Sequence, residues 1–167
     1  MSTDAHRATA PDCVRCVVLV ISDTRTLDTD TGGRAIAELL TAAGHLVVDR
    51  RVLKDDPGPV ADLVRELAAS GIADAVITTG GTGITHRDST FEAIDGLLDK
   101  RLPGFGELFR MLSFEQVGAA AMLSRACAGT CGRLIVLALP GSEKAVRLAM
   151  TRLILPELGH LVSEIRR

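Results

Sequence analysis

Strand-like apolar segments alternate with amphipathic helical patterns along most of this chain. The clearest strand signals are Cys16–Ile21, Ala73–Thr79 and Arg133–Leu139. Strands that are apolar on both faces must be covered on both faces, as in a parallel sheet whose crossover connections are helices. The pattern therefore predicts an α/β fold with three layers, αβα, around a mostly parallel central sheet.

The remaining elements follow from the spacing of apolar residues and from Gly and Pro. Two further strands are predicted, at His45–Leu53 and, as a short edge strand, at Ser124–Ala128. The first predicted helix begins at Thr31 or Gly32 and ends at Gly44. Further helices are predicted at 57–69, at 90–99, around 108–114, at 119–123 and, as a long segment, from Ser142 to about Leu161. Pro156 should kink or restart the last helix.

The size and charge of the chain exclude several classes of protein. It has 167 residues, 47% of them hydrophobic, and a formal net charge of −2. We expect a flexible tail at residues 1–13 and one domain at 14–167. The slightly acidic balance argues against a nucleic-acid partner, which needs a basic face. The polar start is unlike a signal peptide, and no apolar run approaches the ~20 residues of a membrane span, so a cytoplasmic protein is expected.

A glycine-rich segment follows the third predicted strand. This segment, called the glycine loop below, consists of Thr79, Gly80, Gly81, Thr82 and Gly83. Glycines let backbone N–H groups approach a ligand closely, and the helix predicted from Thr90 adds positive partial charge, so the segment predicts an anion site. Asp88 would repel a bare phosphate, but a divalent cation between carboxylate and phosphate removes that conflict. Alternatively, Asp88 only caps the helix or pairs with Arg87.

Polar or glycine-rich residues also follow the other strands of the predicted sheet. They occur at Ser22-Asp23-Thr24, Leu53–Asp56 and Leu139–Ser142. Parallel sheets bind ligands beyond the carboxyl ends of their strands, so these loops and the glycine loop should share one crevice. Ser142 is predicted to cap the last helix, and the amides at Leu139–Ser142, including Gly141, can receive an anion, although chain reversal explains Pro140 and Gly141 equally well. Ser124 and Arg125 could supply a hydroxyl and a cation, or Arg125 could be a surface or subunit-interface residue.

The four cysteines are more easily explained by packing than by metal binding. Cys13 with Cys16 and Cys127 with Cys131 could form a zinc site if the pairs met in space. However, Cys16 opens an apolar strand, and the other pair lies among small residues that pack well. We therefore expect no structural zinc.

The sequence offers no convincing nucleophile for covalent catalysis. It lacks a Gly-x-Ser-x-Gly elbow, a His-Glu-x-x-His motif and a plausible Cys/His pair. Glycine loops, helix starts and carboxylates remain. This inventory suits phosphoryl or nucleotidyl transfer, in which positioning and metal electrostatics carry the reaction.

Several segments taken together resemble the MoaB/MogA family of molybdenum cofactor biosynthesis proteins, and most closely its MoaB branch. They are, in order, Ile21–Thr24, Thr78–Gly83, Arg87-Asp88-x-Thr90, Leu102–Glu107, Met122–Arg125, Leu139–Ser142 and Ile154–His160. The likeness covers roughly residues 14–165. It implies a mixed, mainly parallel sheet, a trimer or hexamer, and adenylylation of molybdopterin with Mg-ATP and release of pyrophosphate.

The resemblance also implies roles for particular residues. The family's essential acidic positions correspond to Asp55 and Asp88, which would hold Mg2+ through the nucleotide. Residues 80–83 would lie along the ligand phosphates. Ser22, Asp23, Ser124 and Ser142 would complete the crevice.

Two positions depart from the family's pattern. Phe91 and Lys54 stand where the family usually has Pro, and neither change removes a carboxylate. Two alternatives to the enzyme remain open. One is a molybdopterin-binding protein of the same pathway without turnover, and the other is a metal-stabilised scaffold that uses the cysteines.

Overall fold

The computed structural model describes residues 10–167. Residues 1–9 of the predicted flexible tail therefore lie outside the described part of the chain. The first fully buried side chain is that of Val14, which packs in the core at the predicted start of the domain. Within residues 10–167, no helix is both long enough and apolar enough to cross a lipid bilayer.

Six strands form one mixed sheet in the order β2-β1-β3-β6-β5-β4. Their bounds are β1 Arg15–Ile21, β2 Leu46–Leu53, β3 Ala75–Thr79, β4 Lys100–Arg101, β5 Cys127–Cys131 and β6 Leu134–Leu139. Strands β2, β1, β3 and β6 run parallel, whereas β5 is antiparallel to both β6 and β4. The predicted α/β fold with a mostly parallel sheet is thus confirmed.

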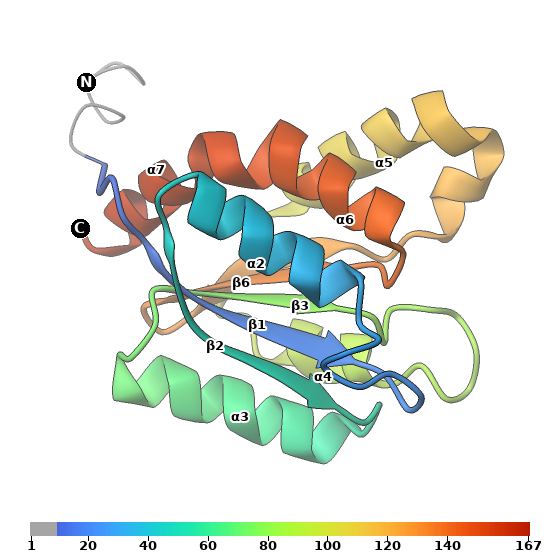
Figure 1. Ribbon diagram of the computed structural model, residues 1–167, viewed down its shortest axis with the longest axis horizontal. Helices are drawn as coiled ribbons and strands as arrows, with labels where there is room; N and C mark the ends of the chain where they lie inside the picture. Colours follow the sequence, from blue (N-terminus) through green and yellow to red (C-terminus); the bar gives the residue numbers. More distant parts are fainter. Residues whose placement is uncertain (1–9) are drawn as a thin grey trace.

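Helices cover both faces of the sheet (Figure 1). One layer contains α2 Gly32–Ala42, α5 Pro103–Val117, α6 Glu143–Ala149 and α7 Leu155–Ile165, and the other contains α3 Pro57–Ser70 and α4 Thr90–Gly96. A 3-10 helix, η1 (Gly118–Leu123), extends α5, and a π-helical segment, η2 (Met150–Ile154), joins α6 to α7. The three predicted layers are present.

Alternate residues of the central strands belong to two separate cores. Val18, Ile77 and Leu137 pack with the layer of α2, α5, α6 and α7. Leu19 and Val136 pack with α3 and α4. Successive side chains of a strand point to opposite faces, so consecutive apolar residues are what a sheet with two covered faces requires.

Three local details differ from the sequence-based expectations. The strand predicted at Ser124–Ala128 lies at Cys127–Cys131, and the two-residue β4 lies outside it at the edge. Helix α5 begins earlier than its apolar pattern, because Pro103 is compatible with the first helical turn. The expected restart near Pro156 is present, but a π-helical segment precedes it.

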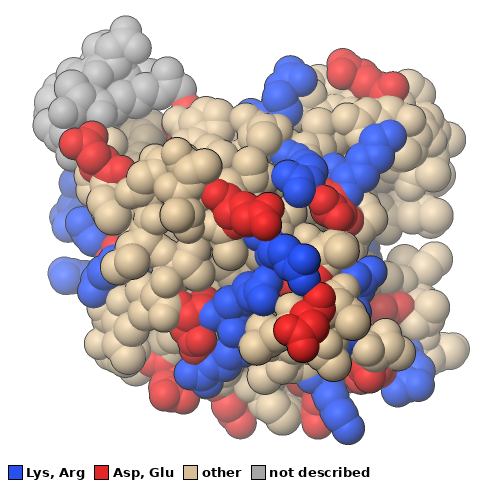
Figure 2. Space-filling model, in the orientation of Figure 1, with Lys and Arg blue, Asp and Glu red and all other residues tan. Residues whose placement is uncertain are grey.

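Charged side chains are distributed over the surface without separation of sign on the face shown in Figure 2. Lys and Arg lie beside Asp and Glu across that face. Mixed charges of this kind produce little long-range field of either sign.

Candidate functional site

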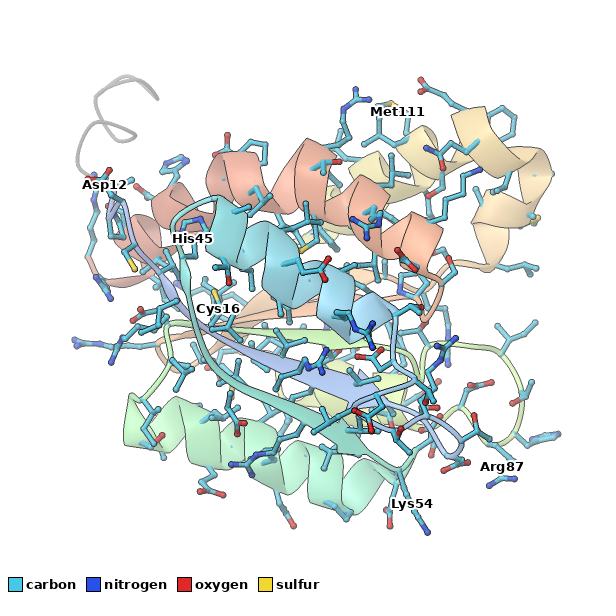
Figure 3. All side chains as sticks on the ribbon, in the orientation of Figure 1. Asp12, Cys16, His45, Lys54, Arg87 and Met111 are labelled. Carbon is cyan, nitrogen blue, oxygen red and sulfur yellow. The ribbon has the colours of Figure 1, made fainter. Side chains whose placement is uncertain are left out.

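The loops that follow β1, β2, β3 and β6 meet at one edge of the sheet, as the parallel arrangement requires. The Ser22 amide donates to the Leu53 carbonyl over 2.8 Å, which joins the first two loops. The Thr79 hydroxyl donates to the Pro140 carbonyl over 2.8 Å, which joins the other two. Figure 3 shows Lys54 and Arg87 at this same end of the molecule. The four loops therefore meet at one edge, although residues 53–56 are not among the lining residues of the two cavities described below.

The glycine loop packs so closely against β1 that larger residues do not fit. Gly80 has φ +92°, and a Cβ atom there would lie 2.2 Å from the Ile21 carbonyl oxygen. Gly81 has φ +66°, and its Cβ would lie 2.9 Å from Ile21 Cγ2 and 3.4 Å from Asp55 Oδ1. Glycine is therefore required at both positions by conformation and by space.

Asp55 is held against the glycine loop by a buried hydroxyl. Thr90 Oγ1 donates to Asp55 Oδ1 over 2.5 Å, and the Asp55 amide donates to Asp23 Oδ1 over 3.2 Å. The other Asp23 oxygen forms an ion pair with Arg87 at 2.8 Å. The structure thus brings two predicted acids, Asp23 and Asp55, together with the start of α4.

Asp88 lies at the other end of the glycine loop, next to Gly83. It accepts hydrogen bonds from the Thr85 amide at 2.9 Å and the Thr85 hydroxyl at 2.5 Å. The hydroxyl hydrogen bond is the largest influence on the pKa of Asp88, which is lowered, so the carboxylate is favoured over the acid. The Asp88–Arg87 pairing considered from the sequence is not formed, since Arg87 pairs with Asp23.

The sequence also predicts a capping box at the start of α4, because Ser89 and Glu92 have the required spacing, but the box does not form. Ser89 occupies the N-cap position but makes no side-chain cap bond, and Glu92 forms an ion pair with Arg125 instead. At the start of α6, by contrast, Ser142 Oγ accepts from the Ala145 amide over 3.2 Å. The predicted Ser142 cap is confirmed.

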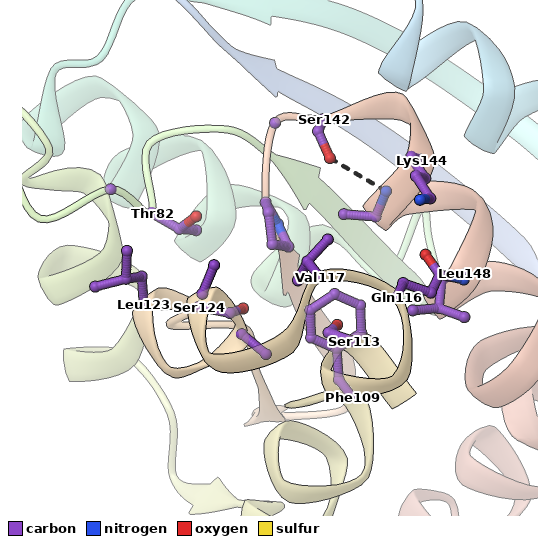
Figure 4. Close-up of a pocket in the computed structure, with 16 residues that line it drawn as sticks. Thr82, Phe109, Ser113, Gln116, Val117, Leu123, Ser124, Ser142, Lys144 and Leu148 are labelled. Atoms are coloured by element: carbon purple, nitrogen blue, oxygen red, sulfur yellow. Dashed lines mark hydrogen bonds between the residues drawn. The ribbon is translucent and has the colours of Figure 1, made fainter. Parts of the chain in front are cut away.

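A cavity of about 380 Å³ opens between the glycine loop, α5 and the start of α6 (Figure 4). Five predicted site residues line it: Thr82, Gly83, Ser124, Gly141 and Ser142. Its wall is mostly apolar and includes the fully buried Phe109. This volume and lining suit an organic ligand with a few polar groups.

Three polar residues of this cavity were not among the predicted site residues. Ser113 and Gln116 come from α5, and Lys144 comes from the first turn of α6. Helix α5 also carries Glu107, Arg110 and Glu115, so two more polar residues in it gave no distinct signal for the first pair. Lys144 adds a positive charge near Ser142, and only its position after a strand end could have suggested it.

A second, smaller cavity of about 110 Å³ adjoins the first at Gly141. It is lined by predicted residues Ser22, Thr79 and Gly80 and by the buried Asp30. Asp30 Oδ1 accepts from the Gly33 amide over 2.9 Å and thereby occupies the N-terminus of α2. The α2 N-terminus is consequently less suited to a ligand anion.

The two acidic residues do not line the cavity of about 380 Å³ themselves, but they lie next to residues of the glycine loop. Neither Asp55 nor Asp88 is among its lining residues, although a Cβ on Gly83, which is one of them, would lie 2.5 Å from Asp88 Oδ2. Among residues 10–167, no group of three or more His, Cys, Asp or Glu side chains is placed to hold a metal ion. Carboxylate oxygens do suit Mg2+, which usually takes one or two of them together with phosphate oxygens.

Cys16 is buried and Cys127 and Cys131 are partly buried, whereas Cys13 is exposed. Burial raises the pKa of the Cys16 thiol to about 12 and that of Cys127 to about 11. Burial also raises the pKa of Cys131. Metal ligation needs the thiolate, so the surroundings of these three cysteines favour their interpretation as packed residues.

Comparison with known proteins places these features in a family. The family model described as "Probable molybdopterin binding domain" matches residues 17–160. Molybdenum cofactor biosynthesis protein B of Bacillus cereus is 52% identical over 168 residues, covering 100% of this chain and 99% of that protein. A crystal structure of molybdenum cofactor biosynthesis protein B is 52% identical, with a TM-score of 0.91, and the match covers 95% of this chain and 99% of that one. The crystal structure of the tungsten cofactor synthesizing protein MoaB from Pyrococcus furiosus is 40% identical, with a TM-score of 0.82. The match covers 95% of this chain and 100% of that one.

Proposed function

The chain belongs to the molybdopterin-binding domain family of molybdenum cofactor biosynthesis proteins, and on this basis we propose that it adenylylates molybdopterin with Mg-ATP. An oxygen of the terminal phosphate of molybdopterin attacks the α-phosphorus of ATP. A new P–O bond forms, the bond from the α-phosphorus to the bridging oxygen breaks, and pyrophosphate leaves. The protein supplies no nucleophile, in agreement with the residues available.

One observation carries this proposal: the glycine loop contacts both a ligand-sized cavity and two carboxylates. Gly83 lines the cavity of about 380 Å³ and adjoins Asp88, whereas Gly81 adjoins Asp55. We assign the apolar cavity to the pterin and the loop amides to phosphate oxygens. Lys144 adds positive charge that would favour an anionic substrate in the cavity.

The two carboxylates would act on the nucleotide side of the loop. Asp55 and Asp88 would hold a magnesium ion, which neutralises phosphate charge when it is bound with ATP. The Thr90 and Thr85 hydroxyls fix these carboxylates, so their orientation is set before the nucleotide binds. Ser22, Asp23, Thr79 and Ser142 would complete the phosphate surroundings.

Turnover is the direct test. We expect purified protein with molybdopterin and Mg-ATP to form adenylylated pterin and pyrophosphate, measured by mass spectrometry. Asp88→Asn should lower the rate at least about 100-fold, because it removes a negative charge that would help to hold Mg2+. Asp62→Asn is the matched control, since Asp62 pairs with Arg65 on the exposed face of α3. Equal rates for Asp88→Asn and the control would refute the role of Asp88.

A non-catalytic pterin-binding protein is the second candidate. The fact that favours it is that both acids are already engaged by threonine hydroxyls and do not line the large cavity. This candidate binds molybdopterin but consumes no ATP. Tight pterin binding without pyrophosphate release would establish it in place of the enzyme.

We further propose that the protein is a cytoplasmic homo-oligomer, a trimer or a hexamer. Leu108, Met111, Phe114 and Val117 recur every three residues along α5 and are 48–61% exposed. Met111 points away from the body of the molecule in Figure 3. An apolar strip of this kind on a helix is typical of a subunit interface. Light scattering that gave a monomer mass would contradict this proposal.

A further inference from the structure

Arg125 makes more contacts with the glycine-loop segment than any role as a free surface cation would require. Its Nε donates to the Thr82 carbonyl over 2.9 Å. Its Nη2 donates to the Gly83 carbonyl and, over 3.2 Å, to the Asp88 carbonyl. Its Nη1 forms an ion pair with Glu92 of α4. All three guanidinium nitrogens therefore form contacts. Two of them donate to backbone carbonyls on either side of residues 84–87, and the third pairs with Glu92 of the following helix.

The Phe91 ring packs against the Arg125 guanidinium. The Arg125 Cζ atom lies 4.5 Å from the centroid of the Phe91 ring. A cation over an aromatic face is attracted by the ring quadrupole, and the ring also restricts the plane of the guanidinium.

The contacts determine which way the loop's peptide groups point. In a trans peptide the carbonyl and the following N–H point in opposite directions. Since Arg125 binds the carbonyls of Thr82 and Gly83, the amides of Gly83 and Ile84 face away from the guanidinium. Arg125 thus separates the acceptors of the loop from its donors. The Gly83 amide donates to the Asp88 carboxylate, so the orientation of this peptide also holds the predicted metal ligand.

Arg125 also fixes the loop relative to the large cavity. Its neighbour Ser124 lines that cavity together with Thr82 and Gly83. The arginine therefore holds the segment before β5 and the segment after β3 together, although they lie 43 positions apart in the sequence. Its side chain is only 24% exposed, so the contacts are partly shielded from water.

We propose that Arg125 is a positioning residue of the proposed adenylyl transfer: it orders residues 82–88 for phosphate binding without contacting phosphate itself. This inference rests on the proposed function for its kinetic consequences. Lysine should not replace it, because one ammonium group cannot donate to three separated carbonyls and also pair with Glu92 in a fixed plane.

The first test measures the loop itself by hydrogen–deuterium exchange of full-length protein. In Arg125→Lys and Arg125→Ala we expect amides of residues 82–88 to exchange about 10-fold faster, while strand amides are unchanged. Arg65→Lys is the control, because Arg65 makes an exposed pair with Asp62 on α3. Wild-type exchange in Arg125→Lys would overturn the proposal.

The second test separates positioning from direct phosphate contact. We expect Mg-ATP to bind about 100-fold more weakly to Arg125→Ala, with the same dependence of log Kd on salt as in the wild type. About 10 mM ethylguanidinium should restore much of that affinity, whereas methylammonium should not. A shallower salt dependence in the variant would show that Arg125 binds phosphate directly and would overturn the proposal.

A milder variant covers the case in which Arg125→Ala fails to fold. Phe91→Leu keeps an apolar side chain and removes the ring face, so loop exchange should increase by a smaller factor, about 3-fold. Unchanged exchange in Phe91→Leu, together with a folded and unaffected Arg125→Lys, counts against the inference. If wild-type protein binds no Mg-ATP, the proposed function fails, and the exchange measurements still decide whether Arg125 orders the loop.

Discussion

At the scale of single residues, the glycine loop depends on backbone conformations that other residues cannot adopt. Gly80→Ala combines φ +92° with a Cβ atom 2.2 Å from the Ile21 carbonyl oxygen. We expect it to lower the free energy of unfolding by at least about 2 kcal/mol, because the backbone must shift at the strand end. Urea denaturation of the variant measures this effect.

Gly104→Ala is the matched control for that prediction. Gly104 lies in the first turn of α5, and within the described part of the chain a Cβ atom there would face open space. Its stability should stay within about 1 kcal/mol of the wild type, since alanine is favoured in helices. Equal effects of the two substitutions would show that the close approach at Gly80 is unimportant.

Residue types in the site were predictable from the sequence, but their partners were not. The glycine motif and Asp88 form a local pattern, so they could be located, whereas the role of Asp55 was implied only by the family resemblance. The partners of Asp55 and Asp88 are the hydroxyls of Thr90 and Thr85, and the latter is an ordinary loop residue. Arg125 meets the loop only through the fold, so neither propensity nor spacing could reveal its contacts.

At the scale of elements, two serines at helix starts make different contributions. Ser142 Oγ accepts from the Ala145 amide, whereas Ser89 makes no side-chain cap bond. We expect Ser142→Ala to lower the free energy of unfolding by about 1 kcal/mol. Ser89→Ala should change it by less than about 0.5 kcal/mol. A larger loss for Ser89→Ala in equilibrium denaturation would reverse this assignment.

The strands of the buried sheet were the most predictable elements, because covered strands need apolar residues on both faces. Strand β4 has only the residues Lys100 and Arg101, which carry no apolar signal. The capping box at Ser89 failed because Glu92 pairs with Arg125, a tertiary contact that outweighs the local pattern. Short edge strands and caps are decided by tertiary contacts, which one sequence does not display.

At the scale of the whole molecule, Asp74 joins distant parts of the chain. It is 7% exposed and lies between Arg15 of β1, at 2.8 Å, and Arg166 near the C-terminus, at 2.7 Å. Burial alone would raise the pKa of Asp74, but hydrogen bonds and charge from Arg15, with a hydrogen bond from Arg166, outweigh it and lower the pKa to about 2. The ion pair therefore favours the folded state while Asp74 is ionised.

This arrangement predicts a specific acid sensitivity. The folded pKa is below the unfolded value of about 3.9, so the stabilisation is complete above pH ~4 and is lost as pH falls through about 2. Its size is on the order of 2 kcal/mol. The difference in unfolding free energy between wild type and Asp74→Asn should shrink over this range in urea titrations. A difference that stays constant from pH 6 to pH 2 would contradict the account.

The central claim is that loops from separate strands form one site for a nucleotide and a pterin. A crystal structure with a non-hydrolysable ATP analogue and Mg2+ tests it most directly. We predict that phosphate oxygens lie within hydrogen-bonding distance of the amides of Gly81 and Thr82, because the Gly80 amide donates to the Leu139 carbonyl and the Gly83 amide to Asp88, with the metal bound to Asp88 or Asp55. A nucleotide bound elsewhere, with its phosphates away from the glycine loop, would contradict the claim.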